Sequence, residues 1–148
     1  MKVFLDTNIL LDILLERDGF EDSATLFQWQ DEGRLEIFVS VLTMINIAYV
    51  YQKTVGQNTA VANLKYLSTL VKTLPMDEAQ LLQAVYMEGK DFEDILQAVC
   101  AAEGGCDCII TRNEKDYRIS AGLKAGRPLL PVMSPSAFLS ARYTSSVQ

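Results

Sequence analysis

The sequence predicts an α/β fold: a three-layer α/β/α sandwich in which helices cover both faces of a central, mostly parallel sheet. Short apolar runs of strand length, such as 2–5, 35–39 and 108–110, alternate along the chain with longer stretches that have apolar residues at helical spacing. The chain has 148 residues, of which 49% are hydrophobic. This length and composition suit one domain with a core on each side of a sheet.

Local signals place the elements in order. The strands are short runs rich in β-branched and other apolar residues, and we place them at Lys2–Leu5, Leu35–Val39, Lys72–Pro75, Cys108–Ile110 and Leu129–Val132. The helices show apolar residues at helical spacing or lie between clear boundary residues. We place them at Thr7–Leu15, Glu21–Glu32, Val41–Thr54, Asn58–Val71, Met76–Met87 (with Asp77 as the alternative start), Asp91–Glu103 and Ser136–Arg142. Ser40 and Asp91 are N-cap residues, while Gly33, Gly56 and Gly89 end helices. We expect residues 1–142 to form the domain and residues 143–148 to form a flexible tail.

The composition restricts the chemistry. The chain has no histidine, which excludes Ser-His-Asp and Cys-His catalysis, histidine-bound zinc and a histidine general base within it. Carboxylates remain, and they suit hard cations such as Mg²⁺ or Mn²⁺. The formal net charge of -6 argues against a broad nucleic-acid-binding surface but does not exclude cleavage of a bound strand.

The three cysteines, Cys100, Cys106 and Cys108, have two interpretations. They form a C-x5-C-x-C metal or redox site, or they are small buried residues. We favour the second, because neither a fourth cysteine nor a histidine completes a zinc site. The odd number of cysteines, the lack of a signal-peptide pattern and the lack of a segment of transmembrane length predict a cytoplasmic protein without membrane association.

Acidic residues occur at three comparable places. Asp6 follows the first strand, Asp91 and Asp94 begin a later helix, and Asp116 follows the strand at 108–110. Each has a plainer role available, as an N-cap, a first-turn acid or a turn residue. Ligands collect at the carboxyl ends of parallel strands, so we expect Asp6, Asp94 and Asp116 to lie within metal-bridging reach of one another. Converging carboxylates repel, and a cation resolves that repulsion.

Three motifs, in order and spacing, resemble those of the PIN-domain family. The opening motif is Val3–Leu10, the central one is Asp94–Ala98 and the closing one is Thr111–Tyr117. The resemblance covers roughly residues 1–140. It implies a small α/β/α fold, metal-dependent ribonuclease activity and, for many members, the role of toxin in a toxin–antitoxin pair.

The resemblance also implies roles for individual residues. Asp6, Asp94 and Asp116 match the family's metal-site acids, which implies that they bind Mg²⁺ or Mn²⁺ and carry catalysis. The polar residues expected to contact substrate or support these acids are Asn8, Asn46, Asp91, Thr111 and Asn113.

One position departs from the family pattern. An acid usually completes a pattern like Ser-x-x-Thr-x-x-Glu, whereas here Ser40 and Thr43 are followed by Asn46. An amide oxygen can ligate a metal or hold a water, but it brings no charge. We expect weaker metal affinity unless Glu93 or Glu103 compensates. Alternatively, Asn46 has only a hydrogen-bonding role.

We therefore predict a Mg²⁺- or Mn²⁺-dependent endoribonuclease with an antitoxin partner. The alternative is a catalytically weakened PIN-like protein that acts by binding a protein or RNA partner. A haloacid-dehalogenase-like phosphatase fits less well, because Asp6–Asn8 lacks that family's second aspartate. Arg112 and Lys115 either orient phosphates or are solvated turn charges, and we favour the latter. Apolar residues on more than one face of the helices at 41–54 and 58–71 belong to the core or to an interface. The PIN resemblance implies a homodimer as a common outcome, and we predict one.

Overall fold

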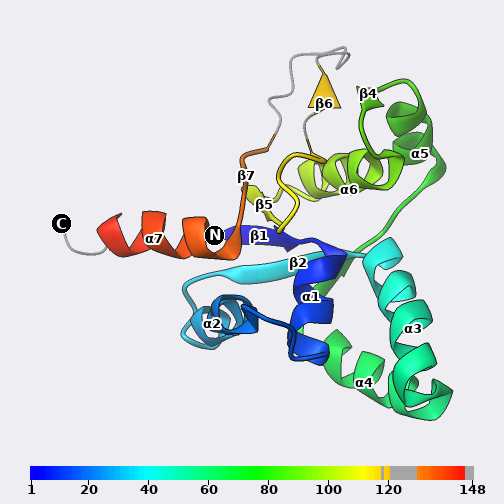
Figure 1. Cartoon of the computed structure of the whole chain (residues 1–148). Coiled ribbons are helices and arrows are strands. Elements are labelled where there is room, and N and C mark those ends of the chain that lie inside the picture. Colours follow the sequence, from blue (N-terminus) through cyan, green and yellow to red (C-terminus); the bar gives the residue numbers. More distant parts are fainter. Residues whose placement is uncertain (118, 121–129, 146–148) are drawn as a thin grey trace.

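A sheet of five parallel strands forms the centre of the molecule, in the order β3-β2-β1-β5-β7 (Figure 1). The strands are β1 (Lys2–Leu5), β2 (Glu36–Ser40), β3 (Lys72–Leu74), β5 (Cys108–Ile110) and β7 (Val132–Met133). This computed structural model describes residues 1–117, 119–120 and 130–145. The predicted parallel sheet is therefore confirmed, and its carboxyl edge carries the residues that follow β1, β2 and β5.

Helices cover both faces of the sheet, as the three-layer prediction requires (Figure 1). On one side lie α1 (Thr7–Leu14), α2 (Phe20–Asp31), α3 (Val41–Val55), α4 (Gln57–Leu70) and α7 (Pro135–Ser145). On the other side lie α5 (Glu78–Val85) and α6 (Phe92–Glu103). Gly104 ends α6 against β3, where an added Cβ would collide with the side chain of Leu74.

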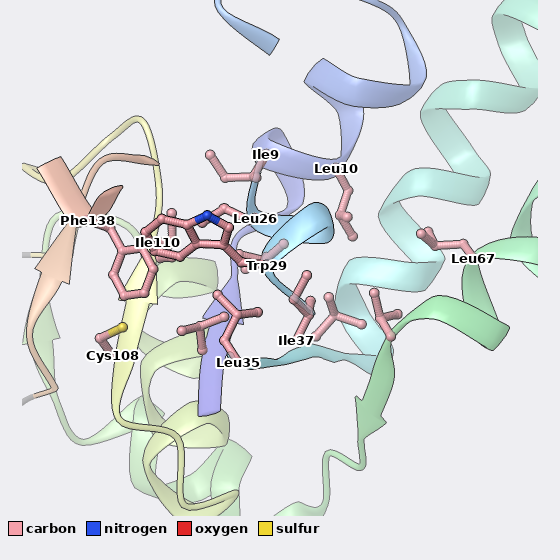
Figure 2. Close-up of a cluster of buried hydrophobic side chains, with 14 of the residues drawn as sticks. Ile9, Leu10, Leu26, Trp29, Leu35, Ile37, Leu67, Cys108, Ile110 and Phe138 are labelled. Carbon is pink, nitrogen blue, oxygen red and sulfur yellow. The ribbon is translucent and has the colours of Figure 1, made fainter. Parts of the chain in front are cut away.

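The sheet divides its apolar side chains between two cores because successive residues of a strand point to opposite faces. Val3 and Leu5 belong to the larger core, whereas Phe4 between them belongs to the core under α6. Figure 2 shows the larger core, with Trp29 of α2 beside Phe138 of α7. The centroids of these two rings are 6.1 Å apart and their planes are tilted by 53°. This packing joins α2 to α7.

Three predicted elements differ from the structure by more than one residue at a boundary. The last strand is Val132–Met133 rather than Leu129–Val132, and Leu129 lies outside the described residues. The helix expected over Met76–Met87 is shorter, because Asp77 caps it at its start and it ends at Val85. The last helix extends to Ser145, into the segment expected as a tail, and residues 146–148 lie outside the described part of the chain. The extent of the domain and its tail stays a prediction.

A short second sheet was not predicted. Its strands, β4 (Glu88–Gly89) and β6 (Ile119–Ser120), pair antiparallel and place the segment before α6 beside the segment after the closing motif. Two-residue strands have no sequence periodicity, so only the tertiary contact reveals them.

Candidate active site

Asp6 is held rigidly at the carboxyl end of β1. Its backbone N–H donates to the carbonyl of Ile110, which continues the ladder between β1 and β5. Its Oδ1 accepts the N–H of Thr7 at 2.7 Å, so Asp6 is also the N-cap of α1. Its Oδ2 accepts the hydroxyl of Thr111, also at 2.7 Å. Asp6 and Thr111 thus lie at neighbouring strand ends, as expected.

The Asp6 carboxylate is buried, with 6% of the residue exposed. Burial raises its pKa above the ordinary value, and this effect exceeds the opposing effect of the hydrogen bonds from Thr111 and Thr7. The Asp6 carboxylate therefore has a fixed orientation, and its hydrogen bonds do not fully offset the effect of burial on its charge.

A buried polar network lies behind Asp6, at the carboxyl end of β2. The side chains of Ser40, Thr43 and Gln97 are fully buried. Ser40 Oγ donates to Gln97 Oε1 at 2.5 Å, and Gln97 Nε2 donates to Thr43 Oγ1 at 3.0 Å. Thr7 Oγ1 donates to Thr43 Oγ1 at 3.3 Å and thereby joins α1 to the network. These bonds tie α1, α3 and α6 together around the site.

Asp94 lies in the first turn of α6, which Asp91 caps by accepting the Asp94 N–H at 3.2 Å. Burial, the largest cause, and the charges of four neighbouring carboxylates together raise the pKa of Asp94 to about 7. These carboxylates belong to Asp6, Asp91, Asp116 and Glu93. The acids predicted from three separate motifs therefore act on one another electrostatically.

Asp116 contacts a cation of the protein itself. Its Oδ1 forms an ion pair with the Nζ of Lys90, the residue before Asp91. Within the described ranges 1–117, 119–120 and 130–145, no group of three acidic or cysteine side chains is close enough to hold a metal ion. The expectation of metal-bridging reach is therefore not met in this structure. Lys90 forms its ion pair with Asp116, and carboxylates without a cation between them repel one another.

Asn46 supports a carboxylate instead of replacing one. Its Nδ2 donates to Oε1 of Glu93 on α6 at 2.5 Å. Burial raises the pKa of Glu93, and the bond from Asn46 opposes this rise. Glu103, the other acid considered as compensation, accepts a hydrogen bond from Gln80 of α5. Glu93 is thus the acid that the structure brings to the position facing Asn46.

The remaining predicted residues have different surroundings. Asn8 is in the first turn of α1, and its Oδ1 is buried without a hydrogen-bond partner among the described residues. The Asn8 side chain also lowers the pKa of Asp6 through a hydrogen bond. Asn113 is exposed, and its backbone N–H donates to Thr111 Oγ1 at 3.0 Å.

The sequence interpretation assigned no role to Tyr117, although this residue ends the closing motif. Tyr117 is 4% exposed, and its hydroxyl makes no hydrogen bond of ordinary geometry within the described part of the chain. Burial raises its pKa well above the usual value, and the charges of Asp6 and Asp94 raise it further. The phenol therefore faces the acidic residues. No sequence signal beyond its place in the motif indicated this.

Asp12 was also missed. It is 1% exposed on α1, and its carboxylate meets Arg112 Nε at 2.8 Å and Arg17 Nη1 at 3.8 Å. An aspartate within the apolar stretch Leu10–Leu14 is itself a signal, since a charge is buried only when it is paired. Arg112 is consequently more than a solvated turn charge.

The cysteines are structural. Cys100, Cys106 and Cys108 are free and buried, and burial raises their pKa values to about 11, 12 and 11. They remain protonated thiols at neutral pH, which confirms the interpretation as small buried residues. In the described ranges, no helix is long and apolar enough to cross a membrane.

Comparison with known proteins gives consistent results. The sequence profile of the PIN domain matches residues 2–115. Ribonuclease VapC1 of Aquifex aeolicus (strain VF5) is 28% identical over 122 residues, which span 78% of this chain and 84% of that protein.

Solved structures share the fold at low sequence identity. VapBC2 of Rickettsia felis, bound to a DNA fragment from its promoter, superposes with a TM-score of 0.68 at 14% identity, covering 90% of this chain and 98% of that one. DNA-bound VapBC of Salmonella typhimurium gives 0.67 at 14% identity, with 91% and 98% covered. VapC20 of Mycobacterium tuberculosis, a sarcin–ricin loop cleaving toxin, gives 0.59 at 18% identity, with 85% and 99% covered.

Proposed function

Because this chain belongs to the PIN-domain family, we propose that it is a divalent-metal-dependent endoribonuclease and the toxin of a toxin–antitoxin pair. The observation that carries the proposal is the position of Asp94 near four other carboxylates at the carboxyl edge of the sheet, where burial and then these charges raise its pKa to about 7. The relative in Aquifex aeolicus is named a ribonuclease, and several solved structures with this fold are toxin–antitoxin complexes. Free thiols at all three cysteines fit a reducing cytoplasm, the compartment we propose.

The donor chemistry of the side chains fits a hard cation, although the described residues do not place three carboxylates within reach of one ion. Asp6, Asp94 and Asp116 would hold Mg²⁺ or Mn²⁺, since these ions prefer oxygen ligands with negative charge. Two observations support this fit. Burial and the charges of four carboxylates raise the pKa of Asp94, and the Oδ1 of Asn8 is buried without a hydrogen-bond partner among the described residues. When bound, such an ion activates water for attack on a phosphodiester and neutralises charge that develops on the phosphate.

The chain's own residues supply orientation. Thr7 and Thr111 fix the two oxygens of Asp6, and the network of Ser40, Thr43 and Gln97 fixes the helices from which Asp94 and Glu93 project. A carboxylate that is already oriented loses little entropy when it binds a cation or substrate. The polar residues around the acids therefore prepare the site before RNA arrives.

Cleavage of single-stranded RNA tests the proposal directly. The purified protein should cleave RNA with Mg²⁺ or Mn²⁺, and chelation should stop the reaction. Asp94→Asn should abolish cleavage, whereas Asp22→Asn, an exposed first-turn acid on α2, should cleave like the wild type. Equal rates of RNA decay in the wild type, Asp94→Asn and Asp22→Asn would indicate a contaminating nuclease and refute the proposed ribonuclease activity.

A second candidate function follows from Asn46. A PIN-like protein with weakened catalysis would act by binding a partner, and the neutral amide at this position favours that candidate. The bond from Asn46 to Glu93 argues the other way, because it holds a carboxylate at the same place. If wild type shows no metal-dependent cleavage but retains a partner, the binding function replaces the enzymatic one.

Two surfaces suit protein partners. A groove of about 310 Å³ lies between α1, α2 and α4, and its apolar lining includes Ile13, Phe27 and Tyr66. We assign it to an apolar segment of the antitoxin. On α3, Ile45 and Tyr49 are 58% and 59% exposed one helical turn apart. Exposed apolar side chains so placed favour a homodimer, which we assign to this helix.

A further inference from the structure

A polar hollow of about 550 Å³ lies immediately beside Asp116. It is lined by Lys90 and by the consecutive residues 112–116 of the closing motif. Three of its six lining residues are the cations Lys90, Arg112 and Lys115, and two are the carboxylates Glu114 and Asp116, so the lining has one more positive than negative charge. In a chain with 13 basic and 19 acidic residues, this is a local reversal of charge next to an acidic centre. Such a reversal is the electrostatic feature expected of an anion-binding site.

The three cations differ in how they are compensated. Lys90 pairs with Asp116, and Arg112 uses its Nε to meet Asp12, which leaves its other N–H donors for further bonds. Among residues 1–117, 119–120 and 130–145, Lys115 has no carboxylate partner within ion-pair distance. The hollow therefore contains one uncompensated ammonium and one guanidinium with donors to spare.

The loop that carries these cations is fixed at several points. Thr111 Oγ1 accepts the Asn113 N–H at 3.0 Å, and the Asn113 carbonyl accepts the Asp116 N–H at 2.9 Å. Glu114 Oε1 accepts the N–H of Ser134 at 3.1 Å, which ties the loop to the start of α7. A loop fixed in this way loses little conformational entropy when it binds a ligand.

The partner of Arg112 strengthens the argument. Asp12 is buried to 1% exposure, and a buried carboxylate is costly unless it is paired. Its pKa is raised by burial, and the charges of Arg112 and Arg17 oppose that rise. The fold thus keeps a buried charge on α1 whose nearest contact holds Arg112 at the rim of the hollow. A solvated turn charge would need no such partner.

We propose that this hollow binds a backbone phosphate of the RNA next to the phosphate cleaved at the acidic centre, with Lys115 and Arg112 as the groups that contact it. The inference rests on the proposed ribonuclease function and names a part of its substrate site. A phosphodiester chain carries one negative charge per nucleotide, so a strand whose reacting phosphate lies near Asp94 places further phosphates on either side of it. The cationic hollow beside Asp116 accepts one of these.

The test measures RNA affinity as a function of salt. A fluorescein-labelled single-stranded oligoribonucleotide is titrated with the Asp94→Asn protein, which prevents cleavage, and binding is followed by anisotropy. In this background, Lys115→Ala should weaken RNA binding several-fold. It should also reduce the slope of the logarithm of the association constant against the logarithm of salt concentration by about 0.7, the value for one lost phosphate contact on a single strand. Lys115→Arg should retain the slope. The matched control is Lys65→Ala, which removes an exposed lysine on α4.

The outcomes separate the inference from the function on which it rests. If wild type cleaves RNA and Lys115→Ala binds with the same slope as Lys65→Ala, the phosphate subsite is refuted while the ribonuclease stands. If the hollow instead binds an acidic protein segment, Lys115→Ala will weaken antitoxin binding and leave RNA binding unchanged, which also refutes it. If wild type neither cleaves nor binds RNA, both proposals fail together.

Discussion

Asp94→Asn should make the metal-free protein more stable at neutral and alkaline pH. Burial, the largest cause, and the charges of four neighbouring carboxylates raise the pKa of Asp94 from 3.8 to about 7. An amide has nearly the same size as the carboxylate but no charge, so the substitution removes repulsion without creating a cavity. The metal-free protein should therefore gain stability from a change that abolishes its activity.

The sign and size follow from linkage. The folded-state pKa lies above the unfolded one, so the folded state binds more protons between pH 3.8 and about 7, and stability falls as pH rises through that window. A rise of about three in the pKa of Asp94 corresponds to at most about 4 kcal/mol in the free energy of unfolding. Asp94 is only partly buried and its neighbours relax, so we expect about 2 kcal/mol. Loss of a first-turn acid opposes this by about 0.5 kcal/mol, which leaves a net gain.

Thermal unfolding in chelator at pH 5 and pH 8 measures the effect. Asp94→Asn should raise the midpoint at pH 8 by about 5 °C and flatten the pH dependence. The control Asp22→Asn changes a first-turn acid that is exposed on α2, and it should be neutral or slightly destabilising. Mn²⁺ should stabilise wild type and have little effect on Asp94→Asn. Equal pH dependence in wild type and Asp94→Asn would refute the reasoning.

Four further expectations can be checked. Asn46→Glu should lower the thermal midpoint in chelator, because it places a second carboxylate beside Glu93. It should increase both the stabilisation by Mn²⁺ and the rate of RNA cleavage, and a smaller stabilisation by Mn²⁺ would contradict this. Asp12→Asn should cost about 1–2 kcal/mol in urea unfolding, since the buried pairing with two arginines is lost. Tyr117→Phe should leave the urea midpoint unchanged or raise it, because its buried hydroxyl lacks an ordinary hydrogen bond. Ile45→Asp should convert a dimer into a monomer by light scattering, and a monomeric wild type at tens of micromolar would refute the dimer.

The sequence predicted the elements whose hydrophobic pattern is local. β1 and β5 have the predicted bounds because strands covered on both faces are continuous apolar runs. β7 was misplaced because the apolar run extends across Pro131. The carbonyl of Pro131 accepts the Ile109 N–H, but a proline has no N–H with which to continue the ladder. The β4–β6 pairing depends on a contact between distant segments, which no local pattern encodes.

The candidate site was predictable where topology alone decides it. Asp6 and Thr111 end adjacent parallel strands, so their proximity follows from strand order. The contacts of side chains on helices were not predictable, because they depend on which sides of neighbouring helices pack together. Asn46 beside Glu93 is an example. The pairing of Lys90 with Asp116 joins two loop residues and depends in the same way on tertiary contact.

These two side-chain pairs together explain how an acidic centre persists without the usual acid on α3. Asn46 donates to Glu93, so the carboxylate absent from α3 comes from α6 instead. The centre then contains five carboxylates, those of Asp6, Asp91, Glu93, Asp94 and Asp116. Lys90 supplies one positive charge, which forms an ion pair with Asp116. One ammonium cannot offset the repulsion that remains at Asp94, whereas a divalent cation can. With Asn46 on α3, the negative charge at this place comes from Glu93, and we expect the acidic centre to bind a divalent cation.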